Sequence, residues 1–209
     1  PYLSWISPEA ARIGAVNTVV NRDGKLYGYN TDIIGITQII SSVTPELKGK
    51  KTLIAGSGGT SKTATEAVRT LGCSDIFVVG RTVRDGVIDY ETAYSSHSDA
   101  DLIINTTPLG MYPDFDSCAL DLTKFSKLSG VVDVVYNPLR TSLVLQAQAL
   151  GIPAVSGLTM LVAQAIAASE LFTQRTPEKT TDEVLNTLWA EKVNVILTGM
   201  PGSGKSTLG

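Results

Sequence analysis

The chain has 209 residues, of which 43% are hydrophobic and 18% are charged, and its formal net charge is −3. This composition is typical of a globular protein, and the acidic balance argues against a nucleic-acid-binding surface, which needs clustered Lys and Arg. The longest apolar stretch, residues 158–172, is interrupted by polar side chains and is too short to span a bilayer, so no membrane contact is expected. Two cysteines, Cys73 and Cys118, form no disulfide framework and no zinc quartet. We therefore expect no metal site and a cytoplasmic protein.

A β-hairpin is predicted over residues 13–30, because Asn, Asp and Gly in NRDG favour a tight turn between two apolar runs. The stretch TDIIGITQIISSV then predicts a helix that Thr31 or Asp32 can cap. The isoleucines of this helix fall on one face: Ile33, Ile36, Ile39 and Ile40.

The middle of the chain alternates short apolar strands with helices. Strands are predicted in KTLIAG, DIFVVGRT, DLIINTTP, GVVDVVYNP and IPAVSG. A helix after the first strand ends at Gly72, and another runs from the cap Thr141 to Gly151. This alternation predicts an α/β fold with a Rossmann-type, doubly wound parallel sheet.

Residues 82–104 leave little room for the helix, strand and helix that a doubly wound half needs at this point. We expect a strand around residues 87–90 and at least one crossover shortened to a loop. Further along, residues 158–173 predict a largely apolar helix, buried on most sides, and residues 180–191 predict a helix with a polar face.

A glycine-rich turn separates the first predicted strand from its helix. Gly56, Gly58 and Gly59 let the backbone approach a pyrophosphate at the N-terminus of that helix, and Thr60 is expected to bind the cofactor with them. Ser61 is small enough for close packing of the helix. The alternative is a purely structural tight turn.

The end of the next strand bears on the choice of cofactor. A carboxylate there would bind the ribose of NAD, whereas this chain has Arg81 and Thr82, with Arg84 close behind. A guanidinium pairs well with a 2′-phosphate, so NADP is favoured. The alternative is an ordinary solvated arginine.

Polar residues also follow the apolar runs near the hairpin. Asn17, Asn30, Thr31 and Asp32 could bind a ligand with several hydroxyl groups. Equally, Asp32 could serve only as a helix cap and Asn30 only as a turn residue.

The stretch VNVILTGMPGSGKSTLG contains a P-loop motif, formed by Gly199, Gly204, Lys205 and Ser206. Lys205 would contact phosphates and Ser206 would bind magnesium. No acidic Walker-B strand follows within the chain, so we expect the motif to be inactive here.

Three runs together resemble the shikimate dehydrogenase family: IGAVNTVV with GYNTD, DLIINTTPLGMYP, and VVDVVYNPLRTSLVLQAQALG with GLTMLVAQA. The resemblance covers roughly residues 3–189 in family order. It implies a split substrate domain beside a Rossmann domain, with the site in the cleft between them. It also implies the NADP-dependent, reversible reduction of 3-dehydroshikimate to shikimate.

The resemblance assigns roles to matching positions, with Asp32 as the carboxylate of the family's catalytic Lys–Asp pair. The positions that match substrate-binding residues are Asn17, Thr31, Tyr136 and Gln164. Gly58 and Gly59 match the pyrophosphate turn, and Arg81 and Thr82 match the residues that bind the 2′-phosphate. The positions expected to hold the nicotinamide end are Thr106, Val134, Gly157 and Met160.

The chain departs from the family pattern in several places. The catalytic lysine would fall just ahead of Pro1, so we expect this chain to be a fragment without turnover. Gly80 replaces the family's usual Asn before Arg81, and Lys62 stands where the family often has Arg. The segment after Arg84 is shorter than usual.

The P-loop stretch resembles the start of a shikimate kinase, which implies a dehydrogenase–kinase fusion. The predicted segments are a substrate-domain remnant (1–32), a linking helix (33–48), an NADP-binding Rossmann domain (49–157), helices that return to the substrate domain (158–189) and a truncated kinase domain (190–209). Because most of the substrate domain's sheet would precede Pro1, apolar side chains such as Ile33, Ile36 and Ile40 are at risk of exposure.

Several functions stay open beside the dehydrogenase. The chain could be a non-catalytic module that senses a nucleotide or metabolite, or it could also act on quinate. A P-loop phosphotransferase would require a complete kinase after Gly209. The oligomeric state also stays open.

Overall fold

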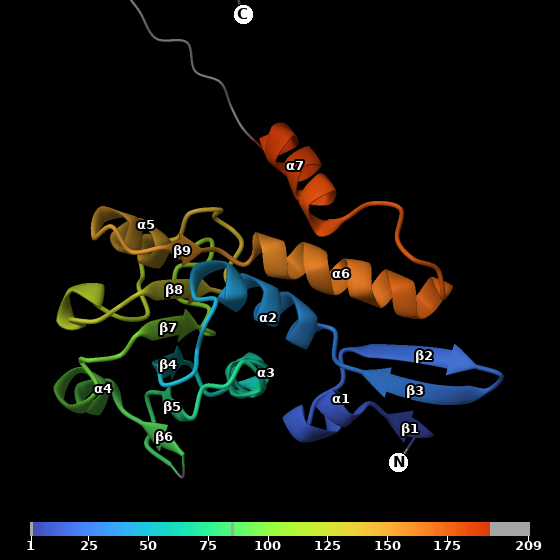
Figure 1. Ribbon diagram of the computed structural model, residues 1–209, viewed down its shortest axis with the longest axis horizontal. Coiled ribbons are helices and arrows are strands. Elements are labelled where there is room, and N and C mark those ends of the chain that lie inside the picture. The colour runs from blue at the N-terminus through green and yellow to red at the C-terminus, as the bar shows by residue number, and fades with distance from the viewer. Residues whose placement is uncertain (1, 85, 193–209) are drawn as a thin grey trace, which may run out of the picture.

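The computed structural model describes residues 2–84 and 86–192, whose strands form two sheets (Figure 1). The smaller sheet has the order β1-β3-β2 and holds β1 (Trp5–Ile6), β2 (Thr18–Arg22) and β3 (Lys25–Tyr29). The antiparallel pairing of β2 with β3 confirms the predicted hairpin. At its turn Asp23 and Gly24 have φ angles of 51° and 79°, the type I′ geometry that an Asp-Gly pair favours.

Six parallel strands form the larger sheet, in the order β6-β5-β4-β7-β8-β9. Their bounds are β4 (Lys51–Ala55), β5 (Asp75–Val79), β6 (Val87–Ile88), β7 (Leu102–Asn105), β8 (Gly130–Asp133) and β9 (Ala154–Val155). This is the strand order of a Rossmann fold, so the predicted fold class is confirmed. The order reverses between β4 and β7, where ligands of such sheets bind outside the carboxyl ends of the strands.

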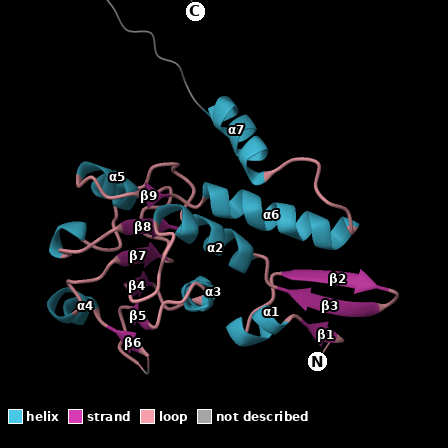
Figure 2. Ribbon diagram, in the orientation of Figure 1, coloured by secondary structure: helices cyan, strands magenta, loops and turns pink. Residues whose placement is uncertain are grey.

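Helices cover both faces of the larger sheet (Figure 2). The helices are α1 (Pro8–Ile13), α2 (Asp32–Val43), α3 (Gly59–Thr70), α4 (Tyr90–Ser96), α5 (Ser142–Ala149), α6 (Leu158–Thr173) and α7 (Thr181–Lys192), with a 3₁₀ turn at Leu122–Lys124. Successive residues of one strand point to opposite faces: Ile54 packs with α2 and α3, whereas Leu53 packs with α4 and α5.

The apolar face of α2 is buried, contrary to the expectation that it would be exposed. Ile36 and Ile40 are completely buried, and Ile33 is partly buried against the same cluster. The reason is that α2 packs on α3, on α6 and on β8 of the larger sheet, and does not depend on the smaller sheet for cover.

The prediction that α6 is buried on most sides was wrong. Its buried residues, Leu158, Met160, Val162 and Ala163, all lie in the first half of the helix. The second half extends past the larger sheet toward β2 and β3 (Figure 1), and Phe172 near its end is 58% exposed. No helix in the described part of the chain is long and apolar enough to cross a membrane.

The short segment after β5 folds largely as expected. The described residues between β5 and β6, 80–84 and 86, form no helix, which confirms the shortened crossover. The strand itself is shorter than predicted, because Asp89 caps α4 by accepting a hydrogen bond from the backbone N of Thr92 at 2.7 Å. Tyr90 is therefore the first residue of α4 and not the end of a strand.

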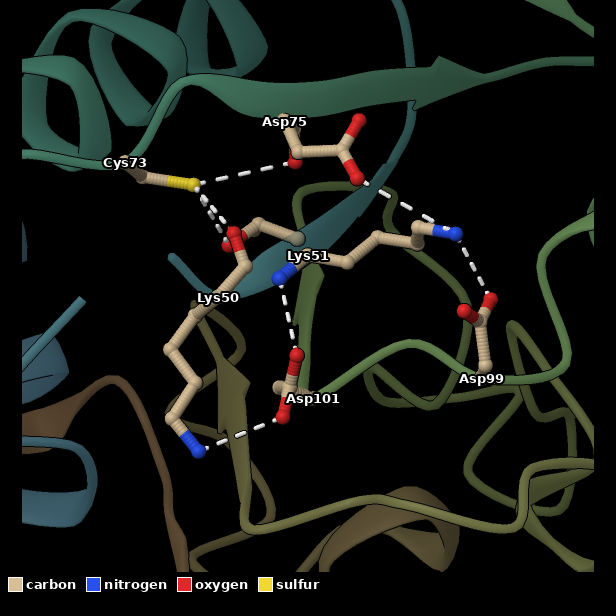
Figure 3. A network of polar contacts seen from close by, with 7 residues as sticks. Lys50, Lys51, Cys73, Asp75, Asp99 and Asp101 are labelled. Carbon is tan, nitrogen blue, oxygen red and sulfur yellow. Dashed lines mark hydrogen bonds and ion pairs between the residues drawn. The ribbon is translucent and has the colours of Figure 1, made fainter. Parts of the chain in front are cut away.

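A charged network ties the amino ends of β4, β5 and β7 together (Figure 3). The Lys51 Nζ atom lies 2.7 Å from Asp99 and 3.9 Å from Asp75, and Lys50 Nζ lies 3.2 Å from Asp101. These side chains are partly exposed, so solvent screens the ion pairs and each one contributes little to stability. The network marks the sheet edge opposite the carboxyl ends of the strands.

A buried carboxylate organises the carboxyl ends of β7 and β8. Asp133 is fully buried and accepts hydrogen bonds from Asn105 Nδ2 at 2.9 Å and Thr141 Oγ1 at 2.6 Å. It also accepts the backbone N–H of Val135 at 3.0 Å. Burial raises the pKa of Asp133, and these hydrogen bonds oppose the shift. Because Asn105 in turn accepts the N–H of Thr107, one network holds the loops after both strands.

The crossing of α2 and α6 is very close. A Cβ atom on Gly35 would lie 2.5 Å from the carbonyl oxygen of Met160 and 2.9 Å from its Cγ. Only glycine at this point allows the two backbones to approach so closely.

Gly35→Ala should lower the free energy of unfolding by about 1–3 kcal/mol, because the new methyl group overlaps the α6 backbone. In an uncrowded helix the same change would stabilise by about 1 kcal/mol, so the sign is diagnostic. The control is Gln38→Ala on the exposed side of α2, with an expected change within about 0.5 kcal/mol. Chemical denaturation measures both, and a more stable Gly35→Ala variant would contradict the crossing.

Asp133→Asn should change the pH dependence of stability. Because the folded-state pKa of Asp133 is raised, the folded protein keeps this proton longer than the unfolded chain as the pH rises. The wild type should therefore lose stability relative to Asp133→Asn as the pH rises from the ordinary carboxyl pKa, about 3.9, through the raised value.

Asp89 provides a control of opposite sign, because hydrogen bonds from the side chain and backbone of Thr92 lower its pKa. Relative to Asp89→Asn, the wild type should gain stability as the pH rises from the lowered pKa to the ordinary one. Unfolding free energies at a series of pH values measure both differences. If the stability difference between the wild type and the variant changed with pH in the same direction at both positions, the raised pKa of Asp133 would be ruled out.

Candidate cofactor and substrate site

The glycine turn follows β4 at the reversal point of the sheet. Gly56 has a φ of +107°, and a Cβ atom there would lie 2.5 Å from Thr106 Oγ1. The Thr106 hydroxyl instead donates to the carbonyl of Ala55 at 2.7 Å, and Gly56 N donates to Val79 O at 2.8 Å. The turn is thereby held by the ends of both neighbouring strands.

The N-terminus of α3 faces open space. Gly58 is its N-cap residue and offers no side chain to bond the first amides of the helix. Cβ atoms on Gly58 and Gly59 would meet nothing within 4 Å. The Ser61 hydroxyl is buried and donates to Gly58 O at 2.7 Å, which closes the inner side of the turn. The outer side leaves helix amides available to an anion.

A cavity of about 370 Å³, called here the turn cavity, lies along this turn. It is lined by Gly56, Ser57, Gly58, Gly80, Arg81, Tyr90, Thr106, Thr107, Pro108 and Leu109. Arg81 thus shares a cavity with the glycine turn, as expected of a cation that binds the phosphate end of a dinucleotide. Gly59, Thr82 and Arg84, although predicted for the same site, do not line it.

Arg84 acts on the turn from outside the cavity. Its Nη2 atom donates to the carbonyl of Ser57 at 2.8 Å, so it steadies the turn's backbone. Gly80 is tightly placed, because a Cβ atom there would lie 3.0 Å from Val87 Cγ1. A side chain at this position would therefore press against Val87.

A second cavity of about 390 Å³, called here the cleft cavity, lies between the hairpin end and the start of α6. It is lined by Asn17, Asp32, Thr60, Val134, Tyr136, Gly157, Met160, Leu161 and Gln164. The structure therefore gathers Asp32, three of the four predicted substrate residues and four of the predicted cofactor residues around one space.

Asn17 holds the loop that presents Asp32. Its Oδ1 atom accepts the backbone N–H of Thr31 at 2.9 Å and the hydroxyl of Thr18 at 3.0 Å. Burial raises the pKa of Asp32, and a hydrogen bond from the Asn17 side chain opposes that shift. A partly desolvated carboxylate beside an amide is suited to bind hydroxyl groups or a cation.

Thr31 occupies a different place from the one predicted. Its side chain is 1% exposed and is absent from the lining of the cleft cavity. It occupies the N-cap position of α2 without a capping hydrogen bond from its side chain. Its hydroxyl lies 3.3 Å from Asn17 Oδ1 and 3.4 Å from Gln164 Oε1, so it links the hairpin to α6.

The start of α6 is pressed against the end of β8. A Cβ atom on Gly157 would overlap the carbonyl group of Val134, so only glycine fits there. Gly157 N donates to Val135 O at 3.0 Å. Met160, one turn further along the helix, is thereby placed among the residues that line the cleft cavity.

Two expectations concern sites elsewhere. The predicted P-loop, Gly199 to Ser206, lies outside the described residues. Within residues 2–84 and 86–192, no group of three or more His, Cys, Asp or Glu side chains could hold a metal ion.

Sequence reasoning overlooked several residues of the site. The sequence predicts Tyr90 as the end of a strand, and Asn105 and Asp133 as ordinary strand residues. A signal for the last two exists: each is a polar residue that ends an otherwise apolar strand, at the edge where the sites of parallel sheets lie.

Comparison with known proteins agrees with this geometry. No family model matches the chain. Among curated proteins it is similar to a shikimate dehydrogenase (NADP(+)) of Bacillus cereus, with 37% identity over 191 residues that cover 84% of this chain and 69% of that protein.

Solved structures agree as well. The chain is similar to a chorismate mutase/shikimate 5-dehydrogenase fusion protein from Clostridium acetobutylicum, with a TM-score of 0.84 and 33% identity over 91% of this chain and 72% of that one. It is also similar to the shikimate 5-dehydrogenase of Thermus thermophilus in complex with NADP(H) and shikimate, with a TM-score of 0.76 and 32% identity over 89% of this chain and 72% of that one. With this identity over more than two thirds of a curated relative, the chain belongs to the shikimate dehydrogenase family.

Proposed function

We propose that the chain carries the NADP site and part of the substrate site of an oxidoreductase that interconverts 3-dehydroshikimate and shikimate. The observation that carries this proposal is the lining of the cleft cavity, where Asp32 and Asn17 share one space with Gly157 and Met160. One wall offers a carboxylate and an amide to hydroxyl groups, and the other is the sheet edge where Rossmann folds bind dinucleotides. The Thermus thermophilus relative, solved with NADP(H) and shikimate, supports the same pairing here.

The residues around the two cavities fit a phosphorylated dinucleotide. The uncapped amides at the N-terminus of α3 suit the pyrophosphate, and the exposed guanidinium of Arg81 suits the 2′-phosphate. Bound NADPH supplies the hydride. Gly157 and Met160, which line the cleft cavity, would hold the nicotinamide end of the bound cofactor near the substrate wall.

Asp32 is the catalytic residue in this proposal. Burial raises the pKa of its carboxyl group, and the Asn17 side chain beside it opposes that shift. None of the ion pairs between described residues involves Asp32. We infer that its partner is the lysine of the family's Lys–Asp pair, which exchanges a proton with the substrate oxygen, while the Asp32 carboxylate orients that lysine and tunes its pKa.

The same proposal divides the chain into functional segments. Residues 1–32 belong to the substrate domain, 33–48 link the domains, 49–157 bind NADP, and 158–189 return to the substrate domain.

Both cysteines of the described residues are free thiols, which fits a reducing cytoplasm.

A second proposal rests on the P-loop motif alone. We infer that residues 190–209 begin a kinase domain, because Gly199 and Lys205 occupy the positions that cradle nucleotide phosphates. The coding sequence after Gly209 tests this inference. It should encode an apolar strand that ends in an acidic residue able to hold magnesium, and a sequence without one would refute the kinase.

Arg81→Asp should weaken NADP binding by about 1–3 kcal/mol and leave NAD binding nearly unchanged, because only NADP carries the 2′-phosphate. Isothermal titration calorimetry on this chain measures both dissociation constants. Arg175→Asp, an equal charge reversal at an exposed site after α6, controls for the change in net charge. An equal loss for both cofactors would show that Arg81 does not select between them.

Asp32→Asn should lower kcat by about 10²–10⁴-fold in a protein that also contains the upstream lysine, because the carboxylate acts in the proton-transfer step. The dissociation constant for NADP should stay the same, since the turn cavity is untouched. Shikimate-dependent formation of NADPH measures turnover. If the unmutated protein binds NADP but never turns over shikimate, the non-catalytic sensing module is the better description.

A further inference from the structure

The shortened crossover after β5 places Tyr90 beside Arg81. β6 pairs in parallel with β5, with Ile88 opposite Val79, and Gly80 N donates to Ile88 O at 2.9 Å. Arg81 and Tyr90 each come two residues after this last pair, where both strands reach the carboxyl edge of the sheet. Arg81 and Tyr90 accordingly line the same turn cavity, although the crossover loop separates them in sequence.

The capped start of α4 fixes the position of Tyr90. It is the first residue of α4, whose start is capped by the Asp89 side chain. Its ring is half-buried and packs against the core cluster that contains Leu53 and Val79. Tyr90 is also one of the residues that line the turn cavity.

The Tyr90 hydroxyl is a donor at neutral pH. Burial raises its pKa, Tyr94 adds to the shift, and the nearby Arg81 guanidinium opposes it. A phenol that keeps its proton can donate a hydrogen bond to an anion, and such charge-assisted bonds are among the strong ones. Gly80, which precedes Arg81, has no side chain to donate.

We propose that Tyr90 is a specificity-determining residue of the cofactor site, whose hydroxyl donates to the 2′-phosphate that Arg81 pairs with in the turn cavity. This inference rests on the proposed use of NADP. It assigns phosphate selection to two segments, the end of β5 and the start of α4, and not to the strand end alone.

The test compares Tyr90→Phe with Tyr94→Phe, using NADP and NAD as ligands of the 209-residue chain. Tyr94 lies on the same helix, but its hydroxyl accepts the N–H of Asp121 at 2.9 Å and does not line the turn cavity. Tyr90→Phe should weaken NADP about tenfold and NAD by less than about twofold, since one charge-assisted hydrogen bond to the 2′-phosphate is lost. Tyr94→Phe should leave both dissociation constants unchanged.

The possible outcomes separate this inference from the proposed function. If the wild type binds NADP no more tightly than NAD, the proposed NADP dependence fails, and the role of Tyr90 fails with it. If the wild type prefers NADP and Tyr90→Phe leaves that preference intact, only the role of Tyr90 is refuted. Equal weakening of both cofactors would also refute it, because the lost contact would then be to the adenosine that they share. Unfolding midpoints of both variants check that the fold is retained.

Discussion

The packing of α2 across α6 determines the geometry of the site. At Gly35 no side chain separates the backbone of α2 from the carbonyl of Met160, so the helices are in direct contact. α2 begins one turn earlier at Asp32, and Gly157 lies one turn before Met160. This contact therefore places Asp32, at the end of the hairpin, next to Gly157 at the carboxyl edge of the larger sheet. A displaced crossing would separate Asp32 from the opposite wall of the cleft cavity.

The polar groups at the amino ends of the strands of the larger sheet differ in burial from those at the carboxyl ends. At the amino edge, Lys50 and Lys51 pair with carboxylates that are partly exposed, so these contacts hold strands in place at little cost in solvation. At the carboxyl edge the polar groups are buried and linked, as Asp133 is to Asn105. Buried networks of this kind are rigid, because any unpaired member would be costly. The loops that line both cavities start from that rigid edge.

The success of sequence reasoning depended on how local each feature is. The Asp23–Gly24 turn and the positive φ of Gly56 follow from backbone preferences of a few residues, and both were predictable. The partial burial of α6 could not be predicted, because an apolar composition does not show where the neighbouring sheet and helices end. Likewise, spacing alone left Asp32 as either a cap or a ligand residue. The resemblance to a family favoured the second role, and the lining of the cleft cavity is consistent with it.

The hairpin, the glycine turn and the alternation of strands with helices can all be predicted from the amino-acid sequence. These features depend on local dihedral preferences and on the period of the apolar residues. Two placements could be seen only in the folded chain: Thr31 links the hairpin to Gln164 and does not line the cleft cavity, and Tyr90 lines the same cavity as Arg81. Such placements arise from strand register and helix contacts between distant segments, and no local pattern in the chain encodes them.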